Sequence, residues 1–286
     1  MSSMPLPKPR FKRRYALVLL AVLGLLAAYG LNLHWKGLLP RGEGFVLWKR
    51  FFYAALRPAI DYESAAVPAG SPPFLWVVLK SVLRTVEFAV ASMGLALIGG
   101  LGLGILSSHS FWDSTIGQGS RGRKLRNRLR ILFRTIAAML RSVHELLWAI
   151  LFLAAIGQNS SAALLALTLP FTGILAKLFS EIMDEAPNEP SAALEGLGCH
   201  PGMALFVGRL PIAWPDMAAY AFYRFECAIR SSAVLGFFGF QTMGYHLELS
   251  YNSLHYREVW TLLYALLFMV WALERWSGIL RRSAVQ

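Results

Sequence analysis

Long apolar stretches, separated by shorter charged or proline-containing segments, dominate the hydropathy pattern of this chain. A bilayer core about 30 Å thick requires about 20 mostly apolar helical residues. The pattern contains such stretches at 15–33, 74–106, 129–156, 161–182, 212–240 and 259–279. It therefore predicts an all-α, polytopic membrane protein with about six transmembrane helices.

Composition supports the same class. The 286 residues are 56% hydrophobic and 15% charged, whereas soluble domains average about 45–50% apolar and about 25% charged residues. So few charges do not cover the surface of a soluble protein of this length, which disfavours a soluble enzyme, a secreted disulfide scaffold and a disordered chain. We interpret Cys199 and Cys227 as free thiols.

The charge is strongly basic, with 28 Lys and Arg against 16 Asp and Glu and a net charge of +12. In a soluble protein this balance suggests nucleic acid, but in a membrane protein basic residues mark cytoplasmic segments. Basic clusters occur at 8–14, 121–130 and 281–282. Six crossings from a cytoplasmic N-terminus return the C-terminus to the cytoplasm, so the number of crossings agrees with the cytoplasmic side that the basic clusters indicate. Because this topology accounts for the basic charge, we expect no nucleic-acid partner. The 121–130 cluster is expected in a cytoplasmic loop.

The predicted organisation has four parts. Residues 1–14 form a cytoplasmic basic terminus, 15–33 the first transmembrane helix, and 34–73 a periplasmic segment with an interfacial aromatic helix at 45–62. Residues 74–283 form a core of five further spans. In the span predicted at 74–106, small residues recur at every fourth position, namely Ser92, Ala96, Gly100 and Gly104. This spacing predicts close packing against another helix.

The segment 184–211 is too long for a simple turn and predicts two short helices, at 191–197 and 201–207. Pro190 suits the first turn of the first helix. Gly198 ends this helix, in a conformation that glycine adopts at little cost. Such an element suits docking into a groove of another protein; an ordinary cytoplasmic hairpin is the alternative.

The residues of this segment resemble the coupling motif of ABC importer permeases, which reads Glu-Ala-Ala, three residues, Gly, nine residues, Ile-x-Leu-Pro. The matching or aligned positions are Ala192, Ala193, Leu194, Gly198, Gly208, Leu210 and Pro211. Ala192 stands in place of the motif Glu and Gly208 in place of Ile. Glu195 is the candidate substitute for the missing Glu.

The resemblance extends over about residues 75–280 and indicates the phosphonate and phosphite subfamily. The segment RSVHEL at 141–146 is similar to an Arg-Ser-Ile-Pro-Glu-Leu segment of those permeases. Further similar segments lie at 177–181, 223–226 and 230–236, and the glycine-rich turn that follows them is altered at 239–244.

The resemblance implies the membrane subunit of an ATP-driven importer for a small phosphorus oxyanion. It would reside in the bacterial inner membrane, pair as a homodimer, and receive ligand from a periplasmic binding protein. ATP and Mg would bind to partner ATPase subunits, so no cofactor is expected in this chain. Nucleotide-driven closure of those subunits would move the coupling segment and switch the membrane helices between inward-open and outward-open states.

Ionisable residues within the predicted spans are the candidates for chemistry. Each costs roughly 2.5–3.5 kcal/mol on insertion scales, so such groups face a cavity or pair with one another. Pairing of Arg84 with Glu87, or of Glu226 with a neighbouring arginine, is one interpretation. A path for an anion is the other, and its candidate residues are Arg141, Arg224, Glu226 and Arg230.

Two other functional classes remain as alternatives. A proton- or sodium-coupled secondary carrier could use Glu87, Glu145 and Glu226, but the two halves of the chain do not resemble each other as inverted repeats often do. A membrane enzyme that modifies lipids would need clustered His, Asp and Ser residues, which the sequence lacks. We predict no catalytic residue and no metal site, since Cys199 and Cys227 have no His or Cys partner at ligand spacing.

Overall fold

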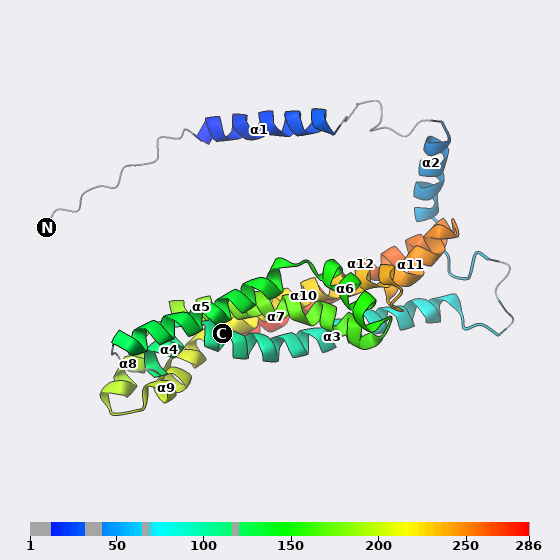
Figure 1. Cartoon of the computed structure of the whole chain (residues 1–286). Coiled ribbons are helices and arrows are strands. Elements are labelled where there is room, and N and C mark those ends of the chain that lie inside the picture. Colours follow the sequence, from blue (N-terminus) through cyan, green and yellow to red (C-terminus); the bar gives the residue numbers. More distant parts are fainter. Residues whose placement is uncertain (1–12, 32–41, 65–67, 69, 116–119, 286) are drawn as a thin grey trace. The chain divides into compact units, whose positions relative to one another are not determined.

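The computed structural model describes residues 13–31, 42–64, 68, 70–115 and 120–285, and most of these are helical, with no strand among them (Figure 1). The chain divides into two compact units, Met1–Leu56 and Arg57–Gln286. The predicted all-α class is confirmed. Nearly all of the predicted basic terminus 1–14 lies outside the described residues.

The first unit contains α1 (Arg13–Gly30) and α2 (Glu43–Ala55). Aromatic rings follow one another along α2, with Phe45 stacked on Trp48 at 6.0 Å between centroids. The helix predicted over 45–62 is observed as Glu43–Ala55, so its predicted end is wrong, and its interfacial location stays a prediction. Pro58 explains the early stop, because a proline disfavours the helical conformation of the residue before it.

The second unit holds the remaining helices, joined by short connections. Its elements are α3 (Phe74–Ser107), α4 (His109–Thr115), α5 (Ser120–Ser142), α6 (Glu145–Ile156), α7 (Ser160–Glu185), α8 (Glu189–Gly196), α9 (Pro201–Ala204), a π-helical turn (Leu205–Arg209), α10 (Leu210–Val234), a 3-10 turn (Leu235–Phe238), α11 (Met243–Asn252) and α12 (Tyr256–Val285).

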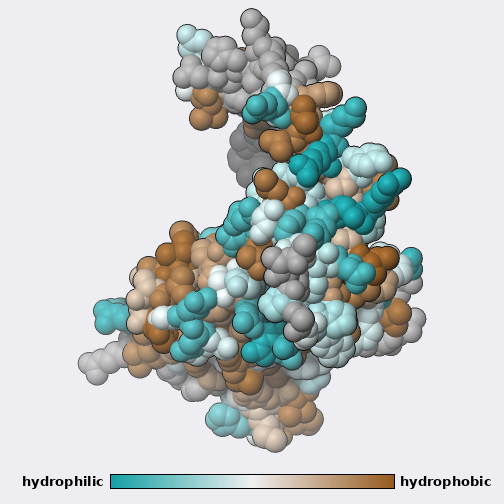
Figure 2. Space-filling view, turned by 90° about the vertical axis from the view of Figure 1, so that its right-hand side faces the viewer, coloured by the Kyte–Doolittle hydropathy of each residue, from teal (hydrophilic) through white to brown (hydrophobic). Residues whose placement is uncertain are grey.

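Three helices among the described residues are long and apolar enough to cross a membrane: Phe74–Ser107, Ser160–Glu185 and Tyr256–Ile279. A fourth crossing results if the bent pair α5 and α6 counts as one span. Figure 2 shows hydrophobic residues over large areas of the surface, which agrees with the many exposed large apolar side chains. An apolar exterior suits a multi-pass membrane protein, and the predicted count of about six spans is compatible with this arrangement.

The structure corrects the predicted single span at 129–156. The residues of this predicted span belong to two helices, α5 and α6, and the chain bends by 87° at the break between Ser142 and Glu145. His144 has an extended backbone there, and its ring nitrogen accepts a hydrogen bond from the main-chain nitrogen of Leu146. The side chain thus caps α6 as a new helix. The basic run at 121–130, expected in a loop, belongs to the first turns of α5.

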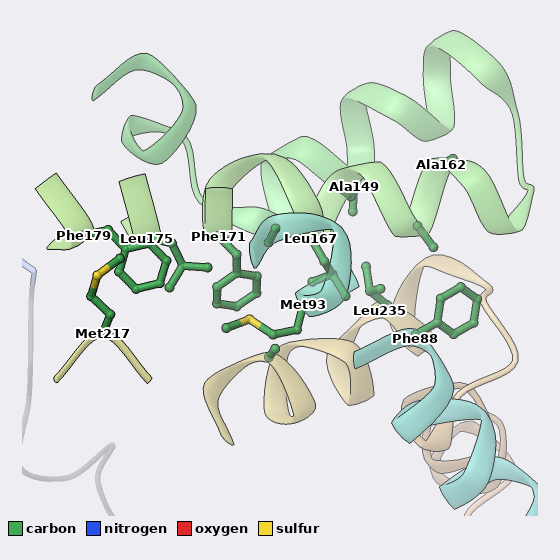
Figure 3. Packing of buried hydrophobic residues seen from close by; sticks show 14 of the residues in the cluster. Phe88, Met93, Ala149, Ala162, Leu167, Phe171, Leu175, Phe179, Met217 and Leu235 are labelled. Carbon is green, nitrogen blue, oxygen red and sulfur yellow. The ribbon is translucent and has the colours of Figure 1, made fainter. Parts of the chain in front are cut away.

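The core is built around α7, which packs against α3, α5, α6 and α10. Figure 3 shows Phe171, Leu175 and Phe179 of α7 in one row with Met93 of α3 and Met217 of α10. The structure places the small-residue stripe of α3, Ser92, Ala96, Gly100 and Gly104, in this buried face. A Cβ atom added to Gly100 would lie 2.7 Å from Cβ of Leu175, so the two helices approach to near-backbone contact.

The predicted span at 212–240 also requires correction, because α10 ends at Val234 and a 3-10 turn follows it. Gly236 packs directly against the backbone of Gly244 and Tyr245 at the start of α11, where a Cβ atom would overlap main-chain atoms. Thr85 of α3 accepts a hydrogen bond from the main-chain nitrogen of Met243 at 3.0 Å. The chain therefore folds back here instead of continuing as one helix, since only glycine permits this approach.

Candidate functional site

The segment that carries the motif forms two short helical arms. Pro190 lies in the first turn of α8, as the sequence predicts. Gly198 follows α8 with a φ of +87°, and its nitrogen donates to the carbonyl of Glu195 at 2.9 Å. Cys199 then donates to the carbonyl of Leu194 at 3.0 Å. Glycine is thus required at position 198, because this turn needs a left-handed conformation.

The second arm is shorter than predicted. Instead of one helix over 201–207, α9 ends at Ala204 and a π-helical turn leads straight into α10. The buried Ser191 hydroxyl donates to the carbonyl of Ala204 at 3.0 Å. A Cβ atom at Gly208 would lie 2.9–3.0 Å from atoms of Ser191. The residue that replaces the motif Ile therefore allows the two arms to pack closely.

The outer surface of these arms carries large apolar side chains. Leu197 is 85% exposed and Met203 is 62% exposed, and Phe206 and Val207 are also exposed. Among the motif positions, the structure leaves Ala192, Ala193, Glu195, Gly198 and Pro211 exposed, Leu194 and Leu210 half-buried, and Gly208 buried. Contiguous exposed apolar residues mark interaction sites in proteins.

Arg209 lies between the motif positions, and we did not single it out from the sequence. Its guanidinium donates to the main-chain oxygen of Asp184 and to the hydroxyl of Ser110, each at 2.7 Å. These partners are 25 and 99 positions away in sequence, so spacing gave no signal for the contact. The motif segment is thereby fastened to α7 and α4.

The four residues predicted to form a path for an anion have different environments. Arg141, in the last turn of α5, and Arg230 on α10 are exposed. Arg224 is half-buried: it lies 5.1 Å from the ring centroid of Tyr220 and donates a hydrogen bond to its hydroxyl. Glu226 is buried.

Two contacts of other charged side chains concern the interpretation that ionisable residues in the spans pair with one another. Arg84 pairs with Glu87 at 2.8 Å, as that interpretation predicts. Glu145 of α6 accepts a hydrogen bond from Ser231 at 2.7 Å, which joins the α5–α6 bend to the part of α10 next to Arg230. Charged groups of α5, α6 and α10 thus occur around one junction.

A cavity of about 730 Å³ lies between α3, α7, α10 and α12. Its lining is apolar throughout and includes Val90, Gly94, Met217, Phe225 and Trp276. An anion loses its hydration in such a space without gaining a partner, so this cavity does not suit an oxyanion. No group of three or more potential metal-ligating side chains exists among the described residues.

Residues 100–274 match the family described as "Binding-protein-dependent transport system inner membrane component". The chain belongs to this family. The match includes the motif segment and the whole of α5, α6, α7 and α10. It favours the importer interpretation over the secondary carrier and the lipid-modifying enzyme.

Named relatives indicate a subfamily. The chain is 35% identical over 149 residues to the phosphite transport system permease protein PtxC of Stutzerimonas stutzeri, a region of 52% of this chain and 54% of the relative. It is 31% identical over 147 residues to the phosphate-import permease protein PhnE of Mycolicibacterium smegmatis, covering 51% of this chain and 28% of the relative. These matches span about half or less of the relatives' lengths.

Solved structures support the fold. The fold of this chain resembles that of a chain in the MetNI methionine ABC transporter in an inward-facing conformation. The TM-score is 0.61 at 20% identity, and the match covers 76% of this chain and 100% of that chain. A chain of an amino acid ABC transporter gives a TM-score of 0.59 at 14% identity, covering 74% of this chain and 99% of that chain. The predicted permease fold is confirmed.

Proposed function

We propose that this chain is the membrane subunit of an ABC importer that passes a small phosphorus oxyanion, such as phosphite or a phosphonate, into the cytoplasm by alternating access. The family match and the relatives named for phosphite and phosphate transport support this proposal. A periplasmic binding protein would deliver the ion, and two ATPase subunits would bind ATP and Mg.

The observation that carries the proposal is the surface of the motif segment. Leu197 and Met203 extend apolar side chains from two arms that hydrogen bonds and the Ser191–Gly208 contact hold together. A preformed apolar ridge loses little conformational entropy when it enters a groove. In this proposal the ridge is cytoplasmic and docks on the ATPase subunit, with both chain termini on the same side of the membrane.

A homodimer completes the proposed assembly. Closed twofold symmetry is the commonest arrangement of identical subunits, and two copies would present two coupling segments to two ATPase subunits. The ion would pass between the copies, along a route that includes Arg141, Arg224, Glu226 and Arg230. The apolar cavity within one copy is not part of this route.

Capture of the ATPase tests the docking surface. The chain is co-expressed with its ATPase and binding protein, and the amount of ATPase retained on the tagged permease is measured. The double variant L197D/M203D should retain at least about tenfold less ATPase, because a central apolar contact contributes about 2 kcal/mol or more to such interfaces. Leu249→Asp on α11 is the matched control, since Leu249 is 55% exposed outside the motif segment.

The substrate class is tested separately, in proteoliposomes that contain the complete complex. Phosphite, methylphosphonate, phosphate and sulfate are compared for stimulation of ATP hydrolysis in the presence of the binding protein. We expect stimulation by at least one phosphorus oxyanion and none by sulfate.

Each experiment has its own contradicting outcome. Equal retention of ATPase by L197D/M203D and wild type contradicts the docking proposal. A response to sulfate alone contradicts the substrate class.

A further inference from the structure

The Asp184 carboxylate, in the last turn of α7, collects hydrogen bonds from the connection between α3 and α4. Oδ1 accepts from the Ser108 hydroxyl at 2.7 Å, from the His109 nitrogen at 2.8 Å and from both the nitrogen and the hydroxyl of Ser110 at 3.1 and 3.0 Å. Oδ2 accepts from the His109 nitrogen at 3.0 Å. One carboxylate therefore holds the end of α3 and the start of α4 against α7.

The same carboxylate reaches α5 through Arg134. The Arg134 guanidinium donates to Oδ2 at 3.3 Å through one terminal nitrogen and to the main-chain oxygen of Ser107 at 3.0 Å through Nε. The Asp184 side chain is 21% exposed, so water competes for only part of this network. Charge-assisted hydrogen bonds of this kind are stronger than neutral ones and fix geometry.

Arg209 connects this network to the motif segment. Its Nη1 donates to the Ser110 hydroxyl at 2.7 Å, and that hydroxyl donates onward to Asp184. Its Nη2 donates to the main-chain oxygen of Asp184 at 2.7 Å. Because Arg209 follows Gly208 in the motif, any displacement of the α8–α9 arms changes the position of its guanidinium relative to α7 and α4.

We propose that Asp184, Ser110 and Arg209 are positioning residues that transmit the movement of the α8–α9 arms to α3, α5 and α7 together. This inference rests on the proposed function, since it assumes that an ATPase subunit displaces these arms. The network joins four helices through directional bonds. It makes them respond as one body, because each bond depends on the direction and the distance between its two partners.

The test compares Asp184→Asn with Glu185→Gln in the reconstituted complex. Asparagine keeps the size of the side chain but removes its charge and replaces one acceptor oxygen with a donor group that faces other donors. Glu185, which is exposed, provides the same change of charge one residue away. Ser110→Ala removes only the hydroxyl between Arg209 and Asp184.

Three quantities are measured for each variant: ATPase retained on the permease, ATP hydrolysis, and ions transported per ATP hydrolysed. We expect Asp184→Asn to retain the ATPase and hydrolyse ATP but to transport at least about fivefold fewer ions per ATP, the lower end of common coupling effects. Ser110→Ala should lower the same ratio by a smaller factor, and Glu185→Gln should leave it unchanged.

The ratio separates a coupling role from a structural one, because loss of folded protein lowers retention, hydrolysis and transport together. If Asp184→Asn fails to fold, the number of ions that Ser110→Ala transports per ATP hydrolysed tests the inference. An unchanged ratio in the folded variants overturns the inference while leaving the docking proposal intact. A wild-type chain that retains no ATPase instead defeats the proposed function itself, and this inference with it.

Discussion

The two sides of α3 differ sharply. One side packs against α7 through Gly100 and Gly104, where added Cβ atoms would lie 2.7 Å from Leu175 and 3.1 Å from Phe179. The other side lines the apolar cavity with Val90, Gly94 and Leu97, and no atom lies within 4 Å of a Cβ atom placed on Gly94.

This difference distinguishes a rigid contact from one with room for movement. Packed interfaces switch between discrete arrangements and resist gradual deformation, so α3 and α7 are expected to move together. Across the cavity, α10 and α12 have space to approach α3. The alternating access that we propose would therefore change the cavity side and preserve the α3–α7 contact.

The largest effect is expected at the tight contact. Gly100→Val should destabilise the protein by at least about 1–3 kcal/mol, as overpacking of a filled core commonly does, because Leu175 obstructs the new side chain. Thermal unfolding in detergent measures this loss. Gly102→Val on the same helix has no atom near its Cβ position and serves as the control. Similar unfolding temperatures for both variants would show that the contact is not rigid.

The cavity side should respond in function more than in stability. Gly94→Leu places a side chain in space that α10 and α12 would need for their approach. We expect the variant to fold and retain its ATPase, with uptake lowered about tenfold, within the range of conformational coupling effects. Uptake into proteoliposomes is compared with Gly94→Ala. Normal uptake with a filled cavity would refute movement on this side.

A smaller effect is expected for Arg230, which is exposed on α10. If it attracts the anion along the path, Arg230→Ala should lower uptake by up to about fivefold, the equivalent of about 1 kcal/mol for an exposed charge. ATP hydrolysis should fall less than uptake, and Arg230→Lys should restore transport. Equal losses of uptake and hydrolysis would remove Arg230 from the path.

The smallest effect is expected for the ion pair on α3 itself. Arg84 and Glu87 are 49% and 62% exposed in their side chains, so Arg84→Gln should change stability by less than about 1 kcal/mol. Its unfolding temperature is measured beside that of Gly100→Val. A loss as large as that of Gly100→Val would mean that this pair, as well as the packing against α7, holds α3 in place.

The sequence predicted the helices whose whole length follows one apolar pattern. The span expected at 74–106 is observed as Phe74–Ser107, and that at 161–182 as Ser160–Glu185. Local signals also gave the turn at Gly198 and the proline in the first turn of α8. Each of these features depends on neighbours within a few residues, which a sequence displays directly.

The bend at His144 was missed because both halves of 129–156 contain apolar runs. A hydropathy pattern does not show whether the helix axis changes direction between them. The end of α10 was missed for a related reason, since the contact between Gly236 and Gly244 becomes evident only when the chain folds back. The motif resemblance singled out the segment 184–211 but assigned no role to Arg209, whose partners are Ser110 and Asp184.

The sequence by itself determined that this chain is a helical membrane protein, and its motif spacing indicated the importer family. Hydrophobic length and short-range spacing are properties of the covalent chain, so they are present before folding. Only the tertiary structure decided which side of α3 is tight, where the apolar cavity lies and how Asp184 joins four helices. Those features depend on residues far apart in sequence that meet only after the helices pack; in the Asp184 network, for example, Arg209 lies 25 positions from Asp184 and 99 from Ser110.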